Sequence, residues 1–129
     1  MSGWEELERF DNPGARVSGS TVKITNQLAI YFSAGFLHKA QAQVGVCENC
    51  VLYYSKPKRA IVIDFIDDPE NWDGAMKMTI KRSCAQVSAR AFFSYNMIDT
   101  EQLRNKTFTP ILTKIPQLEE DRWVIYLDG

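Results

Sequence analysis

The sequence predicts a single α+β domain, in which an antiparallel sheet of about eight strands packs with two short helices. Three observations lead to this fold class. The chain has 129 residues and is 45% hydrophobic, which is enough for one domain with its own core. Apolar and polar residues alternate in most of the extended segments, and this is the period of a half-buried strand. Two segments that follow a serine have the longer period of a helix instead.

The N-terminal region differs from the rest of the chain. Residues 1–14 are polar and end in a turn-forming Asp-Asn-Pro-Gly run, so we expect a flexible arm there and the domain over 15–129. The arm is acidic and has neither the basic start nor the apolar run of a secretory signal. Apolar stretches elsewhere are far shorter than the roughly 20 residues that span a bilayer. We therefore expect a cytoplasmic protein with no membrane contact.

The first half of the domain alternates clearly. Strands are expected at 21–25 and 28–32 because every second residue in each is apolar. Ser33 has the side chain of an N-cap and predicts a helix over 34–44, which Gly45 ends.

A hairpin follows this helix. Its strands are expected at 51–54 and 60–66, and the turn between them contains Pro57, which cannot donate to a ladder. Residues 67–74 are rich in turn formers and acids and are expected to form a loop.

The second half repeats these types of element. Ser88 is expected to cap a second helix over 89–95 that buries Phe92 and Phe93, and Asn96 is expected to end it in a left-handed conformation. Further strands are expected at 76–81, 85–87, 107–115 and 122–127.

The two halves show an internal similarity. When the chain is shifted by 55 positions, Ser33 falls on Ser88, and each serine stands between two short strands and a helix. Arg59 and Arg122 each begin an apolar run in the last strand of a half. The pattern suggests a strand-strand-helix-strand-strand unit that occurs twice, and internal duplication is a hypothesis about topology.

Three segments carry a resemblance to known proteins. They are the hairpin with Tyr53-Tyr54 and the run Arg-Ala-Ile-Val-Ile-Asp-Phe, Gly74 before the strand at 76–81, and Val-Ser-Ala-Arg-Ala-Phe-Phe-Ser-Tyr at 87–95. Over roughly residues 21–98 their order resembles a set of small, uncharacterised bacterial, cyanobacterial and phage proteins. The four strands followed by a helix are similar to the unit of the Whirly and transcriptional-coactivator class of single-stranded DNA binders. That resemblance implies a DNA-binding sheet in transcription regulation and transfers no site residues.

The cysteines offer one candidate metal site. Cys47 and Cys50 form a C-x-x-C pair, and with Cys84 and His38 they would complete a Cys₃His set adequate for zinc. Because Cys84 and His38 lie on separate expected elements, we predict free thiols and no metal. A thioredoxin-like role is not expected, since that motif begins a helix and this one precedes a strand.

Catalytic motifs are not found. The carboxylates of the loop at 67–74 lack the register of a calcium site, because Pro69 and Gly74 interrupt it, and we expect a solvated loop. With one histidine and no phosphate-binding glycine loop or nucleophile elbow, we predict a protein that is not an enzyme and holds no cofactor.

Basic residues are concentrated in the middle of the chain. Over residues 21–90, nine bases against six acids leave a charge of +3, although the whole chain has a net charge of -1. Period-two alternation places several of these bases and one tyrosine on outward strand positions. Lysines that follow phosphates and rings that stack on bases suit single-stranded nucleic acid. The predicted binding face consists of Lys23, Tyr31, Lys77, Lys81 and Arg82.

Two functions from different classes follow from this face. The first is a non-enzymatic module that binds single-stranded nucleic acid or regulates transcription. The alternative is a protein-interaction or assembly module, in which the same face or a sheet edge contacts a protein partner or a second copy of the chain. The near-neutral charge of the whole chain distinguishes it from the clearly basic Whirly-type sheets.

Overall fold

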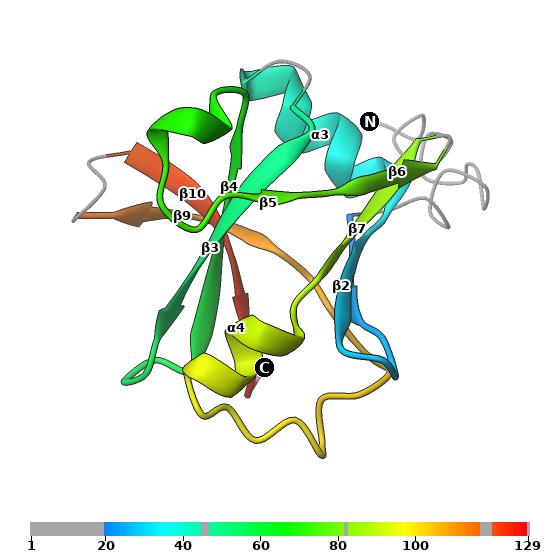
Figure 1. Ribbon diagram of the computed structural model, residues 1–129, viewed down its shortest axis with the longest axis vertical. Coiled ribbons are helices and arrows are strands. Elements are labelled where there is room, and N and C mark those ends of the chain that lie inside the picture. The colour runs from blue at the N-terminus through cyan, green and yellow to red at the C-terminus, as the bar shows by residue number, and fades with distance from the viewer. Residues whose placement is uncertain (1–19, 45–46, 82, 117–119, 129) are drawn as a thin grey trace, which may run out of the picture.

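The computed structural model describes residues 20–44, 47–81, 83–116 and 120–128 (Figure 1). In these ranges the fold is α+β, as predicted, with two α-helices and ten strands in two antiparallel sheets of five. The prediction of one sheet of about eight strands is therefore wrong. The expected arm over 1–14 and Gly45 lie outside the described residues.

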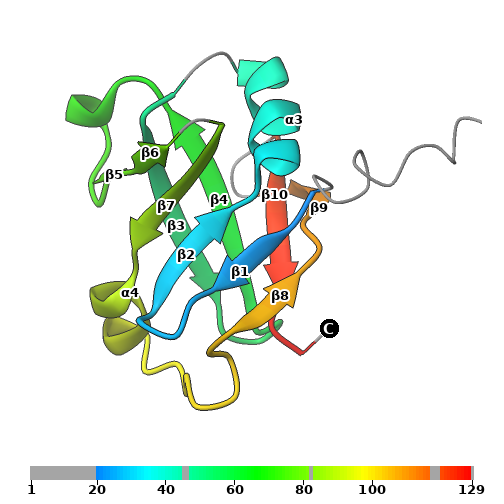
Figure 2. The same ribbon diagram turned by 90° about the vertical axis from the view of Figure 1, so that its right-hand side faces the viewer.

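Each sheet contains strands from both halves of the chain. Sheet A has the order β6-β7-β2-β1-β8, with bounds Thr79–Lys81, Cys84–Ser88, Ala29–Phe32, Val22–Ile24 and Lys106–Phe108. Sheet B has the order β5-β3-β4-β10-β9, with bounds Met76–Lys77, Asn49–Ser55, Ala60–Ile66, Glu120–Tyr126 and Ile111–Ile115. Figure 2 shows sheet A in front of sheet B.

The chain passes directly from one sheet to the other in two places. Only Met78 separates β5 in sheet B from β6 in sheet A, and only Thr109 and Pro110 separate β8 in sheet A from β9 in sheet B. Pro110 has no N–H for a ladder, which explains the break there. The alternation of side chains continues through Met78, so it gave no sign that the strand expected at 76–81 divides between two sheets.

Helix α3 spans Ala34–Val44, as predicted. The predicted N-cap is confirmed, because the Phe36 N–H donates to the Ser33 hydroxyl oxygen at 3.2 Å. The same oxygen accepts the Thr21 N–H at 3.0 Å, so the cap also ties the helix start to the chain before β1. A short 3₁₀ helix, Pro69–Asn71, lies within the expected loop. None of the described helices is long and apolar enough to cross a membrane.

Helix α4 spans Arg90–Tyr95, and its details differ from expectation. The N-cap is Ala89, not Ser88, because β7 continues through Ser88. This later start turns Phe93 into the core at 1% exposure, whereas Phe92 is only partly buried against it. The prediction that both rings are buried is confirmed for Phe93 and is met only in part for Phe92. Asn96 has a φ of -90°, and the left-handed residue is Met97.

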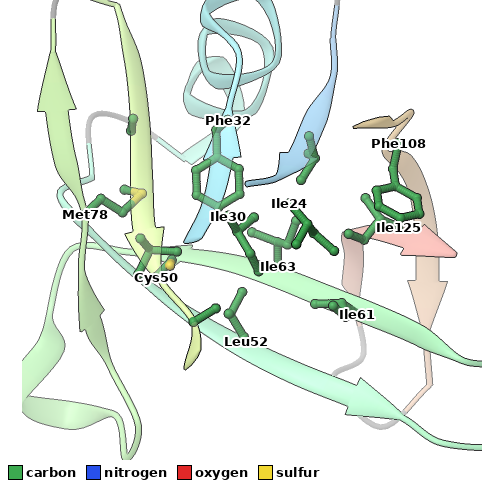
Figure 3. Close-up of a cluster of buried hydrophobic side chains, with 14 of the residues drawn as sticks. Ile24, Ile30, Phe32, Cys50, Leu52, Ile61, Ile63, Met78, Phe108 and Ile125 are labelled. Carbon is green, nitrogen blue, oxygen red and sulfur yellow. The ribbon is translucent and has the colours of Figure 1, made fainter. Parts of the chain in front are cut away.

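The core fills the space between the inner faces of the two sheets. Figure 3 shows side chains from both sheets pointing toward one another, among them Ile30 and Phe32 of sheet A and Ile61 and Ile63 of sheet B. In Figure 1 the helices lie at opposite ends of this space, α3 above and α4 below. Phe36 of α3 is fully buried there, as predicted.

The repeated unit is visible in the element order. The series β1-β2-α3-β3-β4 is followed by the series β6-β7-α4-β9-β10, with β5 as an additional strand before β6 and β8 as an additional strand before β9. Strand β2 pairs with β7, and β4 pairs with β10, so the corresponding strands of the two series lie side by side. An origin by duplication stays a prediction.

The phase of α4 predicts a difference between its two phenylalanines. Phe93→Ala should lower the free energy of unfolding by about 3–5 kcal/mol, because it leaves a cavity in the core. Phe92→Ala should cost less, since part of its ring is already in water. Urea denaturation of both variants measures this, and an equal or larger cost for Phe92→Ala would contradict the packing described.

Candidate nucleic-acid interface

The outward positions of sheet A form a row across all five strands. Lys23 of β1 stands opposite Tyr31 of β2 and opposite Thr107 of β8. Tyr31 in turn stands opposite Gln86 of β7, which pairs with Thr79 of β6. Directly opposite side chains in a sheet lie on the same face. This face, called the sheet A platform below, is the one turned toward the viewer in Figure 2.

Burial shows that the platform faces away from the core. Val22 and Ile24, which flank Lys23, have no exposed surface, and neither have Ile30 and Phe32, which flank Tyr31. Lys23 and Tyr31 are partly exposed, as alternation requires. Lys81 is exposed and pairs with Cys84, two positions from Gln86. Three of the five predicted site residues, Lys23, Tyr31 and Lys81, therefore share one face.

The other two predicted residues do not join this face in the described structure. Lys77 lies in β5 of sheet B, opposite Asn49, because the chain changes sheet at Met78. Its ammonium group is 3.9 Å from a carboxylate oxygen of Glu48. The prediction that Lys77 and Lys81 share a sheet face is wrong. Arg82 lies outside the described residues.

The electrostatic character of the platform is positive. None of its outward strand positions carries a carboxylate. These positions are Thr79, Lys81, Cys84, Gln86, Ser88, Ala29, Tyr31, Lys23 and Thr107. In the described part of the chain, neither Lys23 nor Lys81 has a carboxylate within ion-pair distance. Both cations are thus available to an anionic ligand.

A shallow hollow of about 140 Å³ lies beside the tyrosine. Tyr31, Lys81, Cys84 and Gln86 are among the residues that line it. A side-chain hydrogen bond with Cys84 is the main cause that raises the pKa of Tyr31 above its ordinary value of 10, and burial adds to it. Tyr31 is therefore a neutral phenol at physiological pH, and its ring does not repel phosphate.

The candidate zinc ligands are not brought together. Cys47 and Cys50 are buried, whereas His38 is exposed on α3 and Cys84 lies on the sheet A platform. Over the described ranges, no three His, Cys, Asp or Glu side chains are grouped so that they could hold a metal ion. The Cys₃His arrangement is thus not formed, and none of the three cysteines forms a disulfide in the described structure. The absence of a metal or cofactor in the working protein stays a prediction.

The acidic loop is organised by its own side chains. Asp68 accepts hydrogen bonds from the indole N–H of Trp72 at 2.9 Å and from the Asn71 amide at 3.2 Å. The carboxylates of Asp67, Glu70 and Asp73 belong to exposed residues, as expected for a solvated loop.

The sequence analysis missed the paired charges and the outward tyrosines of sheet B. Arg122 and Asp64 form an ion pair, Nε to Oδ1 3.1 Å, with side chains only 16% and 10% exposed. The tyrosines Tyr53 and Tyr126 lie against buried residues of the same sheet. One signal was available in the sequence: residues 60–66 are almost continuously apolar, which is typical of a strand buried on both faces, and every residue of β4 is indeed buried.

Comparison with known proteins adds no assignment, because no protein-family model, curated protein or solved structure matches this chain. The resemblance to Whirly-type DNA binders and to small bacterial proteins therefore stays a prediction.

The buried ion pair gives a prediction about stability. Asp64→Ala should lower the free energy of unfolding by about 3–5 kcal/mol, because it removes the carboxylate with which Arg122 pairs in a largely buried position. The double variant Asp64→Leu with Arg122→Met should cost much less than the sum of its two single changes. Denaturant unfolding of Asp64→Leu, Arg122→Met and the double variant completes a double-mutant cycle with the parent. Strictly additive changes in the free energy of unfolding would show that the two charges do not interact.

Cys50 gives a prediction about pH. Burial, aided by the charge of Asp64, raises the pKa of Cys50 from 9.0 to about 12. The buried Cys50 thiol therefore contributes its full stabilisation below about pH 9. This stabilisation is lost as pH rises toward 12, because only the unfolded chain releases the thiol proton in that range. Cys50→Ala removes this dependence. The stability difference between parent and variant should shrink by on the order of 1 kcal/mol between about pH 8 and pH 10; a constant difference in denaturant unfolding would contradict this.

Proposed function

We propose that the sheet A platform binds single-stranded nucleic acid and that the protein is a non-enzymatic binding or regulatory module of the cytoplasm. One observation carries the proposal. An outward tyrosine stands directly opposite an outward lysine in the middle of a five-stranded sheet, on a face whose strand positions hold no carboxylate.

The chemistry of the platform matches that of a flexible polyanion. The Tyr31 ring is a surface on which a base stacks, and the Lys23 and Lys81 ammonium groups follow the phosphates on either side. Hydroxyl and amide groups such as those of Thr79 and Gln86 donate hydrogen bonds to phosphate and sugar oxygens. With one ring and few cations, this binding is of modest affinity, tolerant of sequence and sensitive to salt.

A different observation favours the alternative, a protein-interaction module. Tyr95 and Met97, at the end of α4, have 87% and 83% of their surface exposed. Met97 also has a φ of 54°, a conformation that costs energy in a residue other than glycine. Large apolar side chains displayed together in this way are typical of a protein contact.

The nucleic-acid proposal is tested by matched variants of exposed side chains. Tyr31→Ala should weaken binding of a labelled oligothymidylate by about 1–3 kcal/mol, the contribution of one stacked base, while Tyr31→Phe retains most of the affinity. Lys81→Ala should weaken binding at every sequence and make the slope of log affinity against log salt shallower by about 0.7. Fluorescence anisotropy over a salt series measures both effects.

Lys77→Ala is the matched control, because this lysine is also exposed but lies on sheet B beside Glu48. It should leave oligonucleotide binding nearly unchanged. The proposal fails when no binding is seen at low salt, or when Lys77→Ala weakens binding as much as Lys81→Ala does. In that event Tyr95→Ser and Met97→Ser become the variants with which to test a protein contact.

A further inference from the structure

The positive charge of the sheet A platform is not balanced on the platform itself. Among the described residues, neither Lys23 nor Lys81 has an acid within ion-pair distance. The whole chain nevertheless has a net charge of -1, so acids of other segments balance these cations. Two segments are strongly acidic, the loop at 67–74 and residues 1–14, and each contains four acids.

The second of these segments joins the described structure at one end of the platform. The first described residue is Ser20, just before β1. The Thr21 N–H donates to the Ser33 hydroxyl oxygen at 3.0 Å, and the Thr21 carbonyl accepts the Ser33 N–H at 3.0 Å. Ser33 follows the end of β2 that pairs with β7 next to Cys84, which stands opposite Lys81. Because neighbouring strands are about 4.8 Å apart, Thr21 lies about 14 Å from Lys81 across the sheet.

The side chains of residues 1–14 complement the platform in charge and in kind. Four acids against one arginine give these residues a side-chain charge of -3. Two aromatic rings stand among the acids, in the sequence Trp-Glu-Glu-Leu-Glu-Arg-Phe-Asp at 4–11. Anionic groups interleaved with flat rings are also the features by which a protein recognises single-stranded nucleic acid. This segment therefore presents to the platform the same chemistry as the proposed ligand.

We propose that residues 1–14, called the acidic arm below, bind the sheet A platform and compete there with nucleic acid. Carboxylates of the arm pair with Lys23 and Lys81, and a ring of the arm lies on Tyr31. The other acidic segment, the loop at 67–74, is held between β4 and β5 of sheet B, and Figure 1 shows it on the opposite side of the molecule from β2. The inference rests on the proposed function, because it assigns a regulator to the same site.

The length of the connection permits this contact. An extended chain spans about 3.3 Å per residue, so residues 15–20 reach about 20 Å, which exceeds the distance of about 14 Å across the sheet to Lys81. Because the arm and the platform belong to one chain, the effective concentration of the arm is about 1 mM. A contact with a Kd of about 0.1–1 mM then weakens oligonucleotide binding by about 2- to 10-fold.

Neutral substitutions in the arm test the proposal by fluorescence anisotropy with oligothymidylate. The arm variant, which carries Glu5→Gln, Glu6→Gln and Glu8→Gln in the complete chain, should bind about 2- to 10-fold more tightly than the parent.

The matched control is a loop variant with Asp67→Asn, Glu70→Gln and Asp73→Asn. It removes the same amount of negative charge from exposed positions of sheet B's loop. It should bind as the parent does at about 0.1 M salt, where charges more than about 10 Å away are largely screened.

Backbone amide shifts of the ¹⁵N-labelled proteins without oligonucleotide test the contact itself. The arm variant should differ from the parent at Lys23, Tyr31 and Cys84, and the loop variant should not. The inference is overturned when these amides are the same in the parent and the arm variant, or when the arm and loop variants tighten oligonucleotide binding equally. When neither the parent nor the arm variant binds oligonucleotide, the proposed function fails instead, and the amide shifts alone decide whether the arm lies on the platform.

Discussion

The packing of Phe36 against rings from both sheets is the contact on which the rest of the structure depends. Its ring centroid lies 5.9 Å from that of Phe32 in sheet A, and 5.8 Å and 5.2 Å from those of Phe65 and Trp123 in sheet B. Phe32 and Phe65 also meet directly, at 5.4 Å. Because one helix side chain contacts both inner faces, it joins the two sheets through the core, and alternation along each strand then turns the remaining side chains outward.

The two outer faces that result have different chemistry. On sheet A the outward side chains are small and polar apart from Tyr31, and the charges are lysines, so the face suits a solvated polyanion. On sheet B the outward side chains near Val62 are apolar and aromatic, and the ion pair of Asp64 with Arg122 lies beside them. That pair is neutral as a whole.

Local signals in the sequence were sufficient for the elements but not for their partners. The hydroxyl of Ser33 and the apolar run of Ala60–Ile66 identified α3 and β4 with their correct bounds. Alternation across Met78 correctly turned Met78 inward and Lys77 outward, but it gave no sign of the change of sheet, because strand pairing is non-local. Lys77 was therefore assigned to the outer face of the wrong sheet. The apolar cluster around Val62 was missed because Tyr53 and Tyr126 are distant in the chain and come to flank β4 only when β4 pairs with both β3 and β10.

The central claim is that sheet A, not sheet B, is the nucleic-acid surface. The most direct measurement is a titration of ¹⁵N-labelled protein with oligothymidylate, followed by backbone amide shifts. The account predicts changes concentrated at Lys23, Tyr31 and Gln86, in neighbouring strands β1, β2 and β7, with little change at Val62 or Val124. Shifts confined to sheet B, or no shifts at low salt, would contradict it.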